Sequence, residues 1–109
     1  MNKKEREIIS KFKKRLPQDI LRHVRKVIFY GSRARGEGKD DSDLDLAVLV
    51  DQRTREIEKR LEDIAYGVMW DYDFKPIISL KVFGEIQFRE AVARGFSFYK
   101  SVEKEGLSV

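Results

Sequence analysis

The sequence contains no cysteine and a single histidine, His23. The missing thiols exclude a disulfide framework and a thiolate zinc site, and one histidine leaves little for a histidine-based metal site or a catalytic triad. A chain without cysteine also fits a cytoplasmic location, where thiols stay reduced. His23 lies among Arg22 and Arg25, and we expect it to be a surface residue without a chemical role.

Long hydrophobic runs are missing as well. No apolar run approaches the roughly 20 residues that cross a membrane, and the charged N-terminus, with Lys3 and Lys4, lacks the apolar core of a secretory signal. There is no internal repeat, low-complexity tract or interdomain linker. A chain of 109 residues can form one core but not a core plus a separate substrate domain. We therefore predict a single domain over residues 1–109 that does not associate with membranes.

Positive charge is concentrated at one end of the chain. The formal net charge is +4, and residues 1–26 contain ten Lys or Arg against three acidic residues. Such a segment can meet nucleic acid or an acidic partner, although a solvated helix face is the commoner explanation. Phe12 is the only aromatic residue among these basic positions, which argues against a platform for stacking bases.

The most informative stretch runs from Gly31 to Val50. Gly31-Ser32 follows the apolar run Val27–Tyr30, and Asp43-Leu44-Asp45 opens a second apolar run. Because side chains alternate along a strand, the two aspartates point the same way and repel each other unless a cation lies between them. Mg²⁺ prefers carboxylate, water and phosphate oxygens. A glycine turn and a serine at a helix start suit a phosphate. The two ends of the stretch thus predict a metal site and a phosphate site.

Gly31-Ser32, ten further residues and then Asp43-Leu44-Asp45 resemble the signature of the DNA polymerase β-like nucleotidyltransferase superfamily. The fuller match, GSRARG followed by SDLDL, is similar to its smallest members, the minimal nucleotidyltransferases. The resemblance is sharpest over residues 27–50 and extends loosely to a closing helix over residues 98–106. It implies an α/β fold with a small mixed sheet of three or four strands and flanking helices. It also implies transfer of a nucleoside monophosphate, AMP from ATP, to an acceptor hydroxyl with release of pyrophosphate.

The resemblance implies roles for individual residues. Asp43 and Asp45 would hold Mg²⁺ ions, and Gly31 and Ser32 would bind the β- and γ-phosphates together with one ion. Arg33 and Arg35 flank Ala34, so that one can face the cleft and the other solvent, and the resemblance favours Arg33 as an auxiliary phosphate contact.

The family also has a third carboxylate, on a strand beside the Asp-x-Asp strand. Alternation of apolar and polar residues predicts a strand over residues 71–80, edge or bulged because of Pro76. Asp73 is the candidate, with Asp71 in reserve, and it would share a metal or lower the pKa of the attacking hydroxyl. Lys75 occupies roughly the depth at which the family carries its acid, and a cation facing the site there would compete with the metal.

The remaining segments are predicted to be mostly helical. Apolar residues at helical spacing indicate helices over residues 3–15 and 52–69, a helical turn or two over 19–26, and a mostly helical region over 81–109. We expect these segments to supply packing rather than chemistry.

The biological role has one leading hypothesis and two alternatives. By the resemblance, the leading role is that of an antitoxin which adds AMP to a small helical HEPN-type partner. One alternative is a catalytically weak subunit that regulates a partner by contact. The other is a nucleotidyltransferase whose acceptor is a nucleic-acid 3′ end, and a small-molecule acceptor such as an aminoglycoside also stays open.

Overall fold

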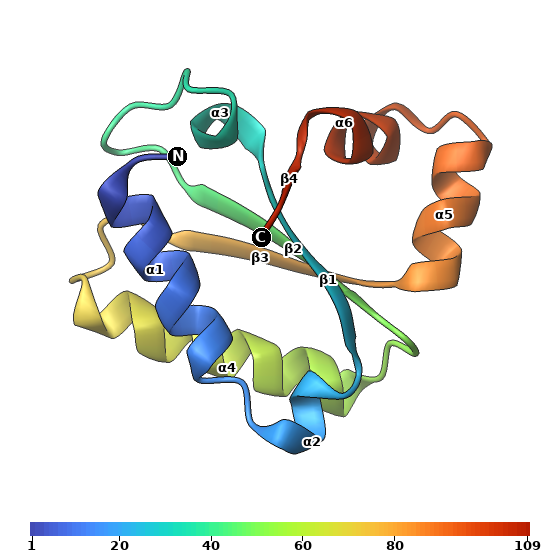
Figure 1. Cartoon of the computed structure of the whole chain (residues 1–109), viewed down its shortest axis with the longest axis horizontal. Helices are drawn as coiled ribbons and strands as arrows, with labels where there is room; N and C mark the ends of the chain where they lie inside the picture. Colours follow the sequence, from blue (N-terminus) through green and yellow to red (C-terminus); the bar gives the residue numbers. More distant parts are fainter.

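The computed structural model describes residues 1–109 and shows a four-stranded mixed sheet with helices on both faces (Figure 1). The strands lie in the order β3-β2-β1-β4, with β2 antiparallel to β1 and parallel to β3, and β4 antiparallel to β1. The predicted α/β class and small mixed sheet are thereby confirmed. The elements are α1 Lys3–Lys14, α2 Gln18–Leu21, β1 Val24–Tyr30, α3 Gly31–Ala34, β2 Leu44–Val50, α4 Arg55–Asp71, β3 Ile78–Gly84, α5 Glu85–Ala93, α6 Ser97–Glu105 and β4 Leu107–Ser108.

Helix α1 begins with a reciprocal cap. The side chain of Asn2 accepts a hydrogen bond from the Glu5 N–H at 2.8 Å, and the Glu5 carboxylate accepts one from the Asn2 N–H at 2.9 Å. Two backbone donors that the helix cannot satisfy are thus both paired. Pro17 follows shortly after the helix and cannot continue it. The predicted helix over residues 3–15 is confirmed to within one residue.

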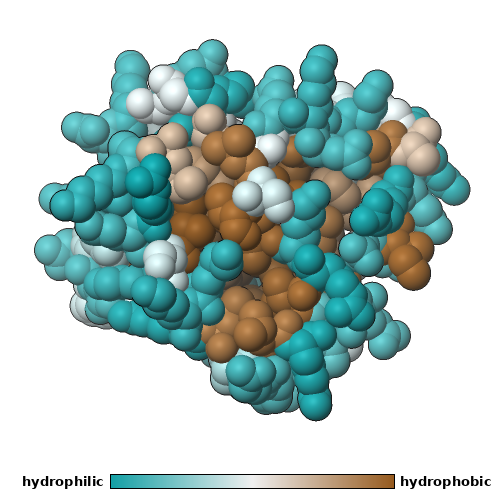
Figure 2. Space-filling model, viewed as in Figure 1, coloured by the Kyte–Doolittle hydropathy of each residue, from teal (hydrophilic) through white to brown (hydrophobic).

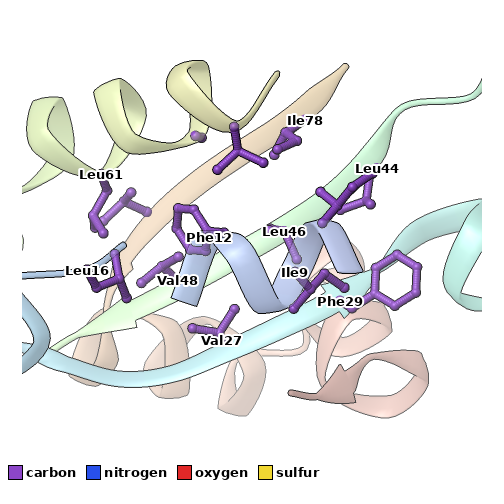
Figure 3. Packing of buried hydrophobic residues seen from close by; sticks show 14 of the residues in the cluster. Ile9, Phe12, Leu16, Val27, Phe29, Leu44, Leu46, Val48, Leu61 and Ile78 are labelled. Atoms are coloured by element: carbon purple, nitrogen blue, oxygen red, sulfur yellow. The ribbon is translucent and has the colours of Figure 1, made fainter. Parts of the chain in front are cut away.

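The main core lies between the sheet and the pair α1 and α4. Alternate residues of β2 from Leu44 to Val50 point to this side and are buried against Phe12 of α1 and Leu61 of α4 (Figure 3). The other face of β2 carries Asp45, Ala47 and Leu49, in the alternation that a strand requires. Helices α5 and α6 cover the Ala47 and Leu49 part of that face. Asp45 therefore lies on the face opposite the main core, at the end where β2 begins.

The predicted strand over residues 71–80 is confirmed for residues 78–80 and wrong for residues 71–77. Helix α4 continues to Asp71, a turn follows, and β3 begins only at Ile78. Within that turn Asp73 and Phe74 have positive φ values of 53° and 58°, which no strand residue adopts. Residues Asp71 to Lys75 alternate polar and apolar side chains as a strand would, but after Asp71 they form the turn. Pro76 precedes the strand and does not interrupt it.

The strand β4 was missing from the prediction. It pairs with Ile28 and Phe29 of β1 through only two residues, a length too short to leave a periodic signal. It closes part of the free edge of β1 and brings the C-terminus against the sheet (Figure 1).

Basic residues of the first quarter surround a shallow apolar hollow. Figure 2 shows apolar residues gathered in the middle of the face on which α1, β1 and β4 lie, between hydrophilic borders. The hollow between α1, α2, β1 and the C-terminus is lined by Leu16, Leu21, Val24, Val27 and Val109 and by the basic residues Lys13, Lys14, Arg25 and Lys26. None of the helices has the length and hydropathy needed to cross a membrane.

Candidate functional site

Asp45 is the centre of the candidate site. It pairs with Tyr30, the last residue of β1, across the antiparallel ladder, and with Ser79 of β3 across the parallel one. Residues directly opposite each other on neighbouring strands share a face of the sheet. Tyr30, Asp45 and Ser79 therefore form one row across three strands, and Asp43 lies just outside the start of β2.

Gly31 is in close contact with Asp45. The chain leaves β1 at Gly31 with φ +83°, a left-handed conformation that side chains disfavour. A Cβ at this position would overlap Oδ2 of Asp45 and would lie 3.0 Å from its Cγ. The glycine thus lets α3 begin directly beside the carboxylate. The structure brings together three of the residues predicted from sequence, Gly31, Asp43 and Asp45.

Electrostatics at Asp45 favour a bound cation. Burial raises the pKa of Asp45, and the Asp43 charge raises it further, while Lys81, the Ser79 hydroxyl and Arg35 lower it without reversing the net rise. The ionised pair is thus unfavourable as it stands, and a divalent cation between the carboxylates would relieve it. Carboxylate oxygens are the ligands that Mg²⁺ prefers, so the donor set fits this metal. No group of three acidic or histidine residues suited to a metal occurs in the chain.

Asp73, the predicted third carboxylate, is not on a strand beside Asp45. It lies exposed in the turn between α4 and β3, as described above. The β3 residues nearest to Asp45 on its face of the sheet are Ser79 and Lys81. Lys75, which was expected at the depth of the site, is exposed in the same turn as Asp73.

Arg33 is held inside the protein. Its guanidinium donates to the carbonyl oxygens of Ser42 and Asp40, both at 2.8 Å, and pairs with the Glu5 carboxylate at 3.1 Å. The side chains of this ion pair are only 8% and 6% exposed. Arg33 therefore ties the loop before Asp43 to α1, and its donors are directed to protein atoms.

Replacing Arg33 tests this structural role. Arg33→Ala is expected to lower the free energy of unfolding by about 3 kcal/mol, because removing one partner of a buried pair strands the other charge. The measurement is urea unfolding, with Arg35→Ala as the matched control. The control loses only exposed ion pairs, so its change should stay below about 1 kcal/mol. An Arg33→Ala protein of unchanged stability that no longer binds ATP would instead support the phosphate contact expected from the sequence.

Arg35 is the arginine whose charge reaches Asp45. Its side chain is 41% exposed and pairs with Glu37 at 2.7 Å and with Glu105 of α6 at 3.4 Å. Exposed pairs of this kind are weak and exchange readily for a phosphate. The sequence interpretation favoured Arg33 as the phosphate contact, whereas the structure places the charge of Arg35 near Asp45.

Tyr30 carries a buried hydroxyl that has no hydrogen-bond partner. Burial, and after it the Asp45 charge, raise the pKa of Tyr30 to about 12. Its ring meets Phe98 of α6 edge-on, with the ring centroids 5.9 Å apart. The sequence interpretation took Tyr30 as a packed aromatic, which holds for the ring. The hydroxyl adds a polar group near Asp45 that the sequence did not reveal.

Two residues near Asp45 were missed as site residues from the sequence, Ser79 and Lys81. They had a usable signal, because Ile78, Leu80 and Val82 alternate with them as core-facing residues do. The predicted strand ended at residue 80 and therefore left out Lys81.

Known proteins resemble the chain in sequence and in fold. The sequence model of the family described as nucleotidyltransferase domain matches residues 6–107. A protein of Methanocaldococcus jannaschii that carries the provisional name protein adenylyltransferase is 31% identical over 106 residues, which cover 94% of this chain and 96% of the relative. A solved structure described provisionally as a minimal nucleotidyltransferase covers 97% of this chain and 89% of its own, with 23% identity and a TM-score of 0.54. This last likeness concerns the fold.

Proposed function

Because the chain belongs to the nucleotidyltransferase domain family, we propose that it transfers AMP from ATP to a hydroxyl group of a partner protein. The observation that carries the proposal is the close assembly of Gly31 with Asp45, beside Asp43. At this end of the sheet the paired carboxylates can bind a metal ion that also binds the triphosphate. The protein acceptor is supported by the name of the relative from Methanocaldococcus jannaschii.

The transfer is a displacement at the α-phosphorus. The acceptor oxygen forms a new bond to phosphorus, the bond between that phosphorus and the bridging oxygen of the β-phosphate breaks, and pyrophosphate leaves. The proton of the acceptor hydroxyl passes to water. Mg²⁺, when bound by Asp43 and Asp45, supplies charge neutralisation to the phosphates. The chain therefore acts mainly by positioning groups and balancing charge.

Each residue of the site has a distinct task in this proposal. Gly31 and Ser32 place the start of α3 against the terminal phosphates, where a backbone turn and a hydroxyl can meet phosphate oxygens. Arg35 exchanges its exposed carboxylate partners for a phosphate. Arg33 shapes the loop before Asp43 and does not contact the nucleotide. Asp73, in its turn before β3, has no part in the reaction.

A HEPN-type helical protein is the partner that we propose, with the chain acting as its antitoxin. This part rests on the resemblance to minimal nucleotidyltransferases. The apolar hollow with its rim of Lys13, Lys14, Arg25 and Lys26 suits a protein partner that carries acidic side chains. It contains no aromatic residue on which a base could stack, so the nucleic-acid acceptor is less well supported.

The thermal midpoint with ATP and Mg²⁺ tests the nucleotide site. A ligand at about a hundredfold over its dissociation constant stabilises by roughly 2.7 kcal/mol, which is several degrees for a domain of this size. We expect that shift to require both ligands and to vanish in Asp43→Asn.

Mass spectrometry tests the acceptor. Incubation of the chain with ATP, Mg²⁺ and a HEPN-type protein should add one AMP to that protein, which its mass will show. An unmodified partner, despite a normal thermal shift, would contradict the acceptor while leaving the nucleotide site in place.

A catalytically weak regulatory subunit is the second candidate. It is favoured by the presence of Ser79 and Lys81, rather than an acid, beside Asp45 on β3. In that case Asp43→Asn would leave inhibition of the partner intact, whereas an antitoxin that works by AMP transfer would lose it.

A further inference from the structure

Lys81 lies on the same face of the sheet as Asp45. The parallel register of β2 and β3 sets Asp45 opposite Ser79 and Ala47 opposite Lys81. Two residues along a strand return to the same face, so Ser79 and Lys81 follow each other along the side that carries the carboxylate. Lys81 is exposed on the edge strand, and its charge already acts on Asp45. A cation built into the protein therefore stands beside the proposed metal site.

The acidic groups around this position are few. Asp43 and Asp45 are the carboxylates of the site, and no third acidic side chain joins them. Asp73 lies in the turn before β3, and Glu85 begins α5 after the strand has ended. The site thus offers two negative charges, which one divalent ion balances.

A second divalent ion would meet unfavourable surroundings. On its β3 side it would find the neutral Ser79 and the ammonium group of Lys81, and no carboxylate. A reaction that uses two metal ions requires oxygen ligands for both ions. The second ion and the Lys81 ammonium would also repel each other, because both are positive in a partly buried site. A lysine ammonium, by contrast, is a compact point charge with three donors on a flexible stem, and it binds phosphate readily.

We propose that this site takes one divalent ion with a nucleoside triphosphate, and that the Lys81 ammonium supplies the second positive charge by contacting the phosphate chain. The proposal rests on the nucleotide-binding function given above and deepens it. It assigns to Lys81, a residue of the edge strand, a binding role for the triphosphate. It also accounts for the pair Ser79 and Lys81 at a place where an acid would favour a second ion.

Counting bound ions tests the proposal. The probes are Mn²⁺, which electron paramagnetic resonance detects directly, and α,β-methylene-ATP, whose α–β linkage cannot be cleaved. We expect one Mn²⁺ per complex of parent protein and analogue. Lys81→Asp should raise the count to two, because it adds a third carboxylate on the face of Asp45. Lys75→Asp is the matched control, since Lys75 lies in the turn before the strand, and its count should stay at one.

A second pair of variants guards against a folding defect in Lys81→Asp. Ser79→Asp places the added carboxylate directly opposite Asp45 and should also raise the count to two. Lys81→Met should keep the count at one but weaken analogue binding about tenfold or more, as the loss of one charge-assisted hydrogen bond does. Far-ultraviolet circular dichroism confirms that each variant is folded.

The outcomes separate this inference from the proposed function. Two ions in the parent complex, or unchanged analogue affinity in folded Lys81→Met, would overturn the role of Lys81 and leave the nucleotide site standing. A folded Lys81→Asp or Ser79→Asp that still binds a single ion would also count against it. A parent protein that binds neither Mn²⁺ nor the analogue would overturn the proposed function and this inference together.

Discussion

Asp45→Asn is expected to lower the rate of AMP transfer at least a thousandfold. The variant keeps the shape of the side chain but removes the charge that would hold the metal–triphosphate complex, and each factor of ten in rate corresponds to about 1.4 kcal/mol of transition-state stabilisation. The measurement is a single-turnover assay with labelled ATP and the partner protein. Asp51→Asn is a suitable control, because Asp51 follows the far end of β2 and pairs with His23 at 3.1 Å. Transfer at the parent rate by Asp45→Asn would contradict the proposed site.

The same substitution should also change how stability depends on pH in metal-free buffer. The pKa of Asp45 is raised by its burial and then by Asp43, so the folded protein keeps this proton to a higher pH than the unfolded chain does. The stabilisation from this protonated carboxyl is therefore complete below the ordinary carboxyl pKa, and it is lost as the pH rises through the raised pKa of the folded protein. Asparagine does not titrate, so urea unfolding of Asp45→Asn should lack this loss and show slightly higher stability than the parent at neutral pH.

Gly31→Ala is expected to damage both stability and transfer. The left-handed backbone at Gly31 costs an alanine roughly 1–2 kcal/mol, and its Cβ would displace the Asp45 carboxylate. We expect a total loss of about 2–3 kcal/mol in urea unfolding, and a fall in transfer of a hundredfold or more, because Asp45 must turn away from its position. The two effects arise from one methyl group.

Gly36→Ala separates these contributions. Gly36 also has a positive φ, +76°, but a Cβ there would have no atom within 4 Å. This control should show the backbone cost alone, roughly 1–2 kcal/mol, with transfer close to that of the parent. Equal losses of stability and of transfer in the two variants would show that the contact between Gly31 and Asp45 has no special consequence.

The parts of the molecule that the sequence predicted well carry strong local signals. Helix α1 has apolar residues at helical spacing and an ending at Pro17, and β1 and β2 are apolar runs on either side of the Gly31 to Asp45 segment. These patterns depend on neighbouring residues alone, so no long-range information was needed. The resemblance then supplied the relation between Gly31 and the two aspartates.

The errors arose where tertiary contacts decide the structure. Whether residues 71–77 continue a helix, turn or extend depends on how α4 packs, and the period of two in Tyr72 and Phe74 was misleading. The partners of Arg33 are set by the folding of a loop back onto α1, which spacing along the chain does not show. The position of Lys81 beside Asp45 follows from the register of β2 and β3, a pairing of residues more than thirty positions apart.

The buried pair of Glu5 and Arg33 has a consequence for the entropy of substrate binding. Glu5 caps α1 through one carboxylate oxygen and pairs with Arg33 through the other, and Arg33 in turn holds two carbonyls of the loop before Asp43. The loop is thus fixed by the same contacts that start the first helix. The entropy cost of ordering this loop is part of the free energy of folding and does not reduce the free energy of nucleotide binding. The site is therefore preorganised, and the cost appears as lower stability of the folded chain.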